Sequence, residues 1–521
     1  MSIHDPVLGI RGADVNLNAV QEVVIQSGGF NAEYGQAMSG IVNLVTKEGG
    51  DRISGELRYR SDAFLPEDYD QGLHLVEADL GGPIPGLRQL KYFFSGAAEL
   101  RDQFIAARYP RREGSELVTD EPGAMRNTDR EYYSGQGKLT YDISPTMKFK
   151  VGGFITRTQR GLYGEHAGLP GTGQWDENGS KYKPLDQMLS LMDKSYQVHG
   201  IWSHTINKST FYTLNVAYFK SHRIRGIRDQ DEEEGRGFWE DYTFIPWWKY
   251  NIIEARTPSQ RDTLWNQHDF YGEEYPWGVS GSTLWGFAFG HMGIWQERLN
   301  EAVESRLDVT SQISNVHQIK VGASFKNNLK IKYDVGQYIY TRPDTADTIL
   351  ENNLYYDTYE VQPLEGSFYV QDKMEFEDLI VNAGVRFDYF DAVNEMFKYP
   401  TGVDPVTGDT TNERVEPDPK YKVSPRLGVS FPVSERTALH MSYGRFFQMP
   451  QFRRLYSNID RPVRKLRGGW PIIGNPDLDA QSTTEYEIGL AHQIGENTSV
   501  GVTGYYKDMF DVLSTRLHPH P

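Results

Sequence analysis

The fold is indicated most clearly by one nine-residue stretch, Val381-Asn382-Ala383-Gly384-Val385-Arg386-Phe387-Asp388-Tyr389. Every odd position carries an apolar or aromatic side chain. Every even position carries a polar or charged side chain or glycine. A period of two residues is typical of a β-strand with one apolar and one polar face. The stretch therefore predicts a strand that separates an apolar from a polar environment.

The same alternation recurs along most of the chain, for example over residues 319–326, 427–431, 439–443 and 486–490. Starting near Ile53, the pattern predicts about 15 strands of roughly 9–14 residues. The connections between them alternate in length. The short ones lie at residues 83–86, 144–145, 207–208, 377–378, 432–436 and 495–497. The long ones lie near residues 104–130, 160–193, 223–302, 334–364, 392–423 and 448–483.

This alternation of short and long connections favours a membrane barrel. A transmembrane β-barrel has tight turns at one end and long loops at the other. A soluble sandwich or propeller also alternates apolar and polar residues, but it has no reason to place every long loop at the same end. We therefore predict an all-β fold, a transmembrane antiparallel β-barrel.

Composition narrows the class of protein. The chain has 521 residues, with 54 basic and 71 acidic side chains and a net charge of −17, which argues against a nucleic-acid binder. The absence of cysteine excludes disulfides, cysteine-ligated metals and thiol catalysis. A mean hydropathy of −0.58 and the lack of a long apolar run exclude transmembrane helices. Aromatic residues make up 13% of the chain, as expected of a barrel with aromatic girdles.

Four segments resemble a known family. Residues 21–35 (QEVVIQSGGFNAEYG) with 39–47 (SGIVNLVTK) are similar to the end of the plug domain of TonB-dependent outer-membrane receptors. Three later segments are similar to the barrel of that family: GSFYVQD at 366–372 with NAGVRFD at 382–388, SPRLG at 424–428 with SYGRFFQMP at 442–450, and NPDL at 475–478 with YEIGL at 486–490.

The resemblance implies a domain organisation. Residues 1–50 would be the C-terminal part of a plug domain, and residues 51–521 a receptor-like barrel truncated at its C-terminus. The family barrel has 22 strands, so the strands counted here imply a fragment, and we expect a receptor of the Bacteroidota type. Within the plug motif we single out Gly28, Gly29, Gly35, Gly40, Asn43, Thr46 and Lys47. Its glycines suit a positive φ or a close approach to the barrel wall, although each also suits an ordinary tight turn.

The resemblance also implies a function. A complete member would bind a scarce solute and import it across the outer membrane of a Gram-negative bacterium, with energy coupled through TonB; the fragment alone would be inactive. Expected partners are outer-membrane lipid, the TonB complex through an N-terminal box not in this chain, a small-molecule, glycan or peptide ligand, and a surface lipoprotein lid. Two alternatives remain open: a passive porin-like or adhesin barrel, and a secreted carbohydrate-binding or carbohydrate-active protein.

The long connection at 223–302 is the candidate ligand loop. Flat aromatic rings with an N–H group suit sugars, aromatic chelates or peptides. The candidate ligand-binding residues are Trp239, Trp247, Trp248, Trp265, Trp277 and Trp285. Packing of these rings within the loop is the alternative. The acidic run at 229–234 resembles a calcium loop only weakly, because Glu234 stands where that loop needs glycine.

Catalytic motifs are missing from the sequence. It contains no H-E-x-x-H, G-x-S-x-G or G-x-x-x-x-G-K-[ST] pattern, and its 13 histidines are scattered. We therefore predict no enzyme activity, no cofactor and no metal site.

In the barrel, we expect Val381, Val385, Val429, Leu439 and Ile488 to face lipid. Arg386 and Glu487 should face the lumen.

Overall fold

The computed structural model describes most of the barrel and much of the N-terminal region. The described residues are 3–14, 16–26, 29, 31–38, 40–66, 70–102, 106–108, 111–113, 116–118, 122–124, 129–162, 189–228, 240–245, 294–338, 354–399, 403–404, 406–459 and 472–515. None of the helices among them is long and apolar enough to cross a bilayer.

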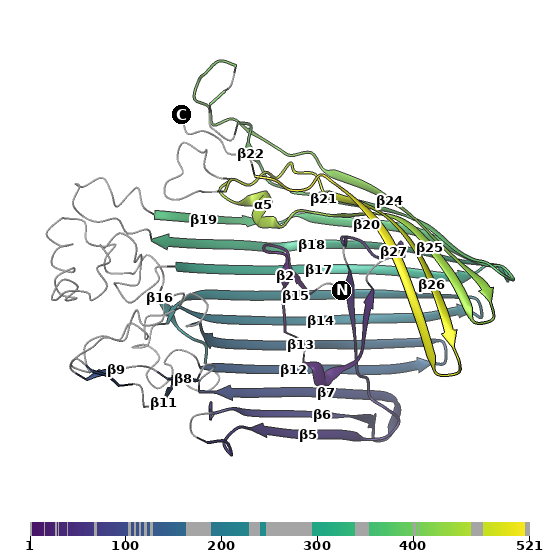
Figure 1. The fold of residues 1–521 in the computed structure, drawn as a ribbon, viewed down its shortest axis with the longest axis horizontal. Coiled ribbons are helices and arrows are strands. Elements are labelled where there is room, and N and C mark those ends of the chain that lie inside the picture. The colour runs from purple at the N-terminus through teal and green to yellow at the C-terminus, as the bar shows by residue number, and fades with distance from the viewer. Residues whose placement is uncertain are drawn as a thin grey trace.

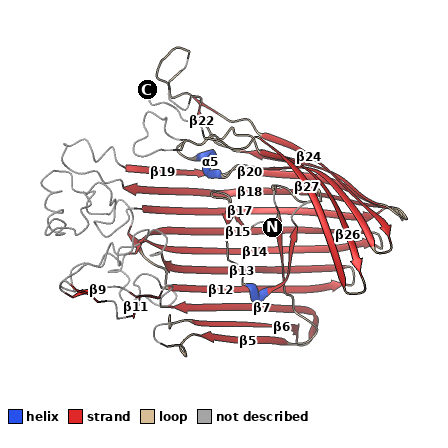
Figure 2. Ribbon diagram, viewed as in Figure 1, coloured by secondary structure: helices blue, strands red, loops and turns tan. Residues whose placement is uncertain are grey.

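One antiparallel sheet dominates the fold, with neighbours that follow chain order (Figures 1 and 2). Its strands are β5 (Ser54–Ser61), β6 (His74–Ile84), β7 (Leu87–Arg101), β12 (Arg130–Ser144), β13 (Met147–Gly161), β14 (Leu189–Asn207), β15 (Thr210–Arg228), β16 (Phe244–Ile245), β17 (Ile294–Gln312), β18 (His317–Tyr338), β19 (Leu354–Val361), β20 (Leu364–Glu375), β21 (Ile380–Asp391), β24 (Lys420–Ser434), β25 (Thr437–Gln448), β26 (Gln481–Ile494) and β27 (Thr498–Phe510). Because β19 and β20 both pair with β18 and β16 has two residues, the described sheet has about the 15 strand positions that were predicted.

The predicted short turns are confirmed. They join β6 to β7, β12 to β13, β14 to β15, β20 to β21, β24 to β25 and β26 to β27. A seventh short turn, at residues 313–316 between β17 and β18, was missed. All these turns lie at one end of the sheet, hereafter the short-turn end, and the opposite end is the long-loop end. At the two ends of the chain order, β5 pairs with β6 and β27 with β26.

The predicted faces agree with the structure. Val385 is 40% exposed, whereas Arg386 is 7% exposed and turned to the lumen. Ile488 is 53% exposed, and its neighbour Glu487 pairs with His440. Val381, Val429 and Leu439 are half-buried.

Several strands are longer than predicted. Strands β14, β15 and β17 have 19 residues each and β18 has 22, whereas a tilted strand needs only about 9–11 residues to cross the hydrocarbon core. Toward the short-turn end their outward residues are apolar, as at Val216 and Leu307. Toward the long-loop end their outward residues are polar and contact one another. For example, His222 and Lys332 both contact Glu297. These strands therefore extend beyond the bilayer.

The N-terminal segment, residues 3–50, lies against the lumenal side of this sheet (Figure 1). It contains β1 (His4–Asp5), β2 (Ile10–Arg11), the 3-10 helix η1 (Leu17–Ala19), β3 (Val20–Gln26) and β4 (Ile41–Thr46). β1 pairs with β2 and β3 with β4, so the segment forms two small hairpins. It touches opposite parts of the wall: Asn16 bonds to Ser95 of β7 at 3.0 Å, and Ala32 to Gln371 of β20 at 2.9 Å.

The connections at the long-loop end carry the remaining short elements. They are β8 (Ala106–Arg108), β9 (Arg111–Glu113), β10 (Glu116–Val118), β11 (Pro122–Ala124), β22 (Met396–Phe397), β23 (Arg414–Val415) and the helix α5 (Phe452–Tyr456). β8 pairs with β11, β9 with β10 and β22 with β23.

Candidate functional site

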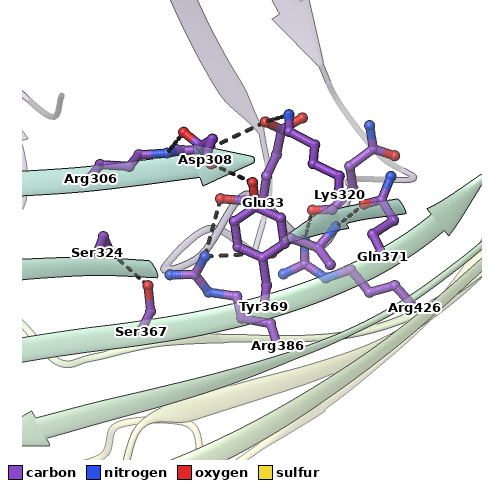
Figure 3. Close-up of polar contacts among 12 residues, drawn as sticks. Glu33, Arg306, Asp308, Lys320, Ser324, Ser367, Tyr369, Gln371, Arg386 and Arg426 are labelled. Carbon is purple, nitrogen blue, oxygen red and sulfur yellow. Dashed lines mark hydrogen bonds and ion pairs between the residues drawn. The ribbon is translucent and has the colours of Figure 1, made fainter. Parts of the chain in front are cut away.

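The wall of the barrel holds one turn of the N-terminal segment through charged side chains. This inner turn, residues 31–36, carries Glu33. Lys320 Nζ donates to the Glu33 carboxylate at 2.5 Å, and Arg306 Nη2 donates to it at 3.3 Å (Figure 3). Arg306 is itself oriented by Asp308, which accepts from its Nε at 2.7 Å and its Nη2 at 3.0 Å. The Tyr369 hydroxyl also donates to Asp308. Charge-assisted bonds of this kind are the strong ones in a polar interior.

The same wall satisfies the backbone of the inner turn. Arg386 Nη1 donates to the Glu33 carbonyl at 3.1 Å, and Arg426 donates to the carbonyl of Asn31. The Ala32 amide donates to the Gln371 side chain at 2.9 Å. A buried turn cannot leave its peptide groups unpaired without a cost. The turn is thus specified by wall residues from five strands, β17, β18, β20, β21 and β24 (Figure 3).

Two motif glycines have a physical reason at this site. A Cβ on Gly35 would lie 2.5 Å from Arg386 Nε, so a side chain at this position would displace the guanidinium from the turn. Gly29 has φ +60°, a conformation that L side chains rarely adopt. Gly40 and Asn43 are exposed. Gly28 lies outside the described residues.

The last motif residues bind the segment to a different part of the wall. The Lys47 amide donates to the Ala19 carbonyl at 2.8 Å, and its side chain lies 3.7 Å from Asp79. Lys138 Nζ donates to the Thr46 carbonyl at 3.0 Å. One residue later, Glu48 accepts from Lys150 at 2.6 Å. Burial alone would raise the pKa of Glu48, but Lys150 and Lys138 hold that pKa below its usual value.

A second, apolar contact lies near the long-loop end. The helix α5 buries Phe452, Leu455 and Tyr456 in a cluster with Val7 of the N-terminal segment. The cluster also contains wall residues of β18, β19 and β21, namely Ile331, Tyr333, Tyr359, Val361 and Phe390. We call this set the mouth cluster. The Phe452 amide donates to Pro6 O at 2.8 Å and the Arg453 amide to Val7 O at 3.1 Å.

The loop after β15 is shorter than predicted, because β15 continues to Arg228 and β17 begins at Ile294. Trp295 is therefore a strand residue, 7% exposed, whose ring meets Phe244 edge-on. Residues 240–245 of the loop form an outer strap on the face of the sheet opposite to the lumen. Its Tyr242 amide donates to Gln159 at 2.9 Å, and Arg228 covers the Tyr242 ring at 3.8 Å.

The six candidate tryptophans at 239, 247, 248, 265, 277 and 285 lie outside the described residues, as does the acidic run at 229–234. Among the described residues, no group of three His, Asp or Glu gathers as a metal site would require.

Sequence reasoning placed Arg386 on the lumenal face but did not identify Arg306 and Lys320 as partners of Glu33. Glu33 stood within the quoted motif, but its partners Arg306 and Lys320 lie more than 270 positions away. The available signal was a basic residue at a polar position of an alternating strand, as at Arg386. The helix α5 was missed because five residues leave no helical periodicity.

Comparison with known proteins identifies the barrel. A family model described as "TonB dependent receptor-like, beta-barrel" matches residues 126–520. The chain belongs to this family. The receptor-like barrel places the protein in the outer membrane of a Gram-negative bacterium, and the family is one of receptors and transporters rather than enzymes.

Individual relatives of this receptor are distant. The TonB-dependent transporter Oar of Myxococcus xanthus is 26% identical over 211 residues, which cover 33% of this chain and 19% of the relative. A ferric enterobactin receptor mutant from Pseudomonas aeruginosa has TM-score 0.56 at 15% identity, covering 98% of this chain and 62% of that one. The siderophore receptor PirA from Acinetobacter baumannii has TM-score 0.55 at 13% identity, covering 98% and 61%. These structures show the fold, and the receptor chain spans less than two thirds of their length.

Proposed function

We propose that the complete protein is an outer-membrane receptor that captures a scarce solute and imports it with energy coupled through TonB. In this proposal residues 1–50 are the C-terminal part of a plug, and residues 51–521 belong to the barrel. The observation that carries it is the inner turn, a polar connection between the proposed plug and the wall that Glu33 makes with Lys320 and Arg306. A passive porin or an adhesin has no need for such a segment in its lumen, and the family match does not favour a secreted carbohydrate-active protein.

The expected partners follow from this proposal. They are outer-membrane lipid, the TonB complex and a ligand that is a small molecule, glycan or peptide. The ferric enterobactin receptor of P. aeruginosa has been solved with enterobactin, which supports the small-molecule class. A surface lipoprotein lid and a Bacteroidota source belong to the same proposal.

A disulfide between plug and wall tests the import mechanism. A Cβ built on Gly29 lies 3.9 Å from Cβ of Ser442, within the range of about 3.5–4.5 Å that a disulfide requires. The 521 residues contain no other cysteine. The Gly29→Cys/Ser442→Cys variant of the complete protein should lock the plug when oxidised. The left-handed φ at residue 29 costs about 1–2 kcal/mol in this variant.

The measurement is growth of a deletion strain that carries the parent or the variant, on defined media limited in one nutrient at a time. We expect a nutrient whose use requires the parent protein and TonB. Oxidation of the double-cysteine variant should abolish this growth, because the disulfide locks the plug, and addition of a reductant should restore it. Each single-cysteine variant should behave like the parent. Growth that continues with the cross-linked protein, or that does not need TonB, would contradict the proposal.

We further propose that the tryptophans at 239, 247, 248, 265, 277 and 285 contact the ligand. Replacing Trp247 or Trp248 by Ala in the complete receptor should weaken binding by about 1–3 kcal/mol if its ring is an anchor. Trp202 of β14, whose Nε1 donates to Tyr212 at 3.1 Å, is the control on the barrel wall. Its replacement should alter the melting temperature and leave affinity unchanged. If both loop variants bind the ligand with the affinity of the parent, these rings pack within the loop and do not contact the ligand.

A further inference from the structure

The helix α5 has two faces of different chemistry. Phe452, Leu455 and Tyr456 point into the mouth cluster and are at most 4% exposed. Arg453 and Arg454 stand between them and are half-buried. Within the part of the chain that the structure describes, neither guanidinium has a carboxylate in ion-pair range. This distinguishes them from Arg306 and Arg386, which are paired with Asp308 and Asp388.

The sequence around α5 is basic in an otherwise acidic protein. The whole chain carries a net charge of −17. Residues 453–467, by contrast, have a single acidic residue, Asp460, and the basic residues Arg453, Arg454, Arg461, Arg464, Lys465 and Arg467. Only the first two of these lie among the described residues, and the argument about geometry rests on them. A local surplus of positive charge raises the local concentration of anions.

The position of α5 connects these arginines to the N-terminal segment. The amides of Phe452 and Arg453 hold the carbonyls of Pro6 and Val7. Arg453 also lies within electrostatic range of the Tyr333 hydroxyl on the lumenal wall. A group bound by the two side chains would therefore rest on the same helix whose backbone amides bind Pro6 and Val7 of the N-terminal segment.

We propose that Arg453 and Arg454 form a subsite for an oxyanion, a carboxylate or phosphate group of the imported solute. Two adjacent, half-buried arginines with no carboxylate partner among the described residues keep their side-chain N–H groups open for a ligand. An oxyanion supplies the missing counter-charge, and the planar fork of arginine binds it through two parallel hydrogen bonds. This inference rests on the proposed import function and specifies the chemical class of the solute.

The test uses the complete receptor in detergent with defined probes. Citrate supplies carboxylates, inorganic phosphate supplies a phosphate, maltose is a neutral probe and spermidine a cationic one. Binding is measured by titration calorimetry for the parent and for Arg453→Gln/Arg454→Gln. Glutamine keeps helix propensity and leaves the backbone amide of residue 453 in place. The contact with Val7 O is therefore retained, and the melting temperature checks it.

A matched control removes two positive charges from another loop at the same end. Lys398 is paired with Glu413, and Arg414 covers the Phe397 ring at 4.6 Å. The variant Lys398→Gln/Arg414→Gln should bind the anionic probes like the parent. The Arg453→Gln/Arg454→Gln variant should bind them at least about tenfold more weakly, as expected on loss of charged hydrogen bonds. Preference for citrate or for phosphate identifies the group that the subsite takes.

Failure of this inference is distinguishable from failure of the import proposal. A parent that binds neither anion, or an arginine double variant that binds them like the parent, overturns the subsite. If the arginine double variant supports TonB-dependent growth as well as the parent does, the subsite is also overturned, whereas the import proposal stands. Anion binding lost in the arginine double variant, in a protein that supports no TonB-dependent growth, sustains the subsite and overturns import.

Discussion

The inner turn and the mouth cluster hold the same N-terminal segment by opposite physical means. At the inner turn, Glu33 meets Lys320 and Arg306 across the polar lumen. At the mouth cluster, Val7 packs against Leu455 and Tyr456, all of them fully buried. The first contact depends on charge and direction, the second on excluded area. We therefore expect the two contacts to open independently, in response to different changes in conditions.

The largest effect is expected from Leu455→Ala in the complete receptor. Removing a fully buried leucine from the mouth cluster should cost about 2–5 kcal/mol locally. Hydrogen exchange at the Gly9 amide, which donates to Asp5 O at 2.9 Å, should become much faster, while exchange at Ala32 should not change. Leu307→Ala, on the outward face of β17, is the control. Equal acceleration at both amides would show that the two contacts open together.

Glu33→Gln should produce the reverse pattern. The amide keeps the shape of the side chain but leaves Lys320 without its carboxylate, at a cost of about 1–3 kcal/mol. Exchange at the Ala32 amide should accelerate by about tenfold or more, and exchange at Gly9 should stay at the parental rate. Glu395→Gln, at an exposed loop position, should alter neither. An unchanged rate at Ala32 would mean that backbone contacts alone hold the inner turn.

Salt should separate the two regions without any substitution. Raising NaCl from about 0.1 to about 1 M shortens the Debye length from about 10 to about 3 Å. Exchange at Ala32 should accelerate slightly. The free energy of opening should fall by less than about 1 kcal/mol, because the ion pairs at Glu33 are partly shielded from solvent. Exchange at Gly9 should not accelerate. Faster exchange at Gly9 in high salt would contradict an apolar mouth cluster.

The smallest effect concerns pH and Glu48. Because its pKa in the folded protein lies below the usual value, its pairing with Lys150 stabilises the protein above the unfolded pKa of about 4.3. This contribution is lost as the pH falls through the folded pKa. Between pH 6 and pH 3, the melting temperature of the parent should therefore drop more than that of Glu48→Gln. The corresponding difference in the free energy of unfolding should be less than about 1 kcal/mol, because the Glu48 side chain is one third exposed. If the melting temperatures of the parent and of Glu48→Gln drop equally, the pairing of Glu48 with Lys150 does not stabilise the protein.

Much of the barrel was predictable because its signal is local. The alternation at residues 381–389 predicted both the strand β21 and the opposite faces of Val385 and Arg386. Pro, Gly, Asn and Asp at the short connections predicted six of the tight turns.

The site was predictable only in part. Motif residues such as Gly35 could be singled out, but its reason, the approach of Arg386, required the fold. Strand ends were misplaced at β15 and β17 because the alternation changes there from apolar–polar to polar–polar above the bilayer. Trp295 was for this reason assigned to a loop.

By itself, the sequence determined the strands, their faces, most of their turns and their likeness to an outer-membrane receptor. Each of these depends on neighbours within about ten residues, where pleat geometry and turn chemistry act directly. Only the tertiary structure decided which wall residues meet Glu33, that α5 grips Pro6 and Val7, and that the outer strap lies on the outward face of the sheet. These contacts join residues far apart in the chain, and their partners are selected by the register of many strands together. No local pattern encodes that register.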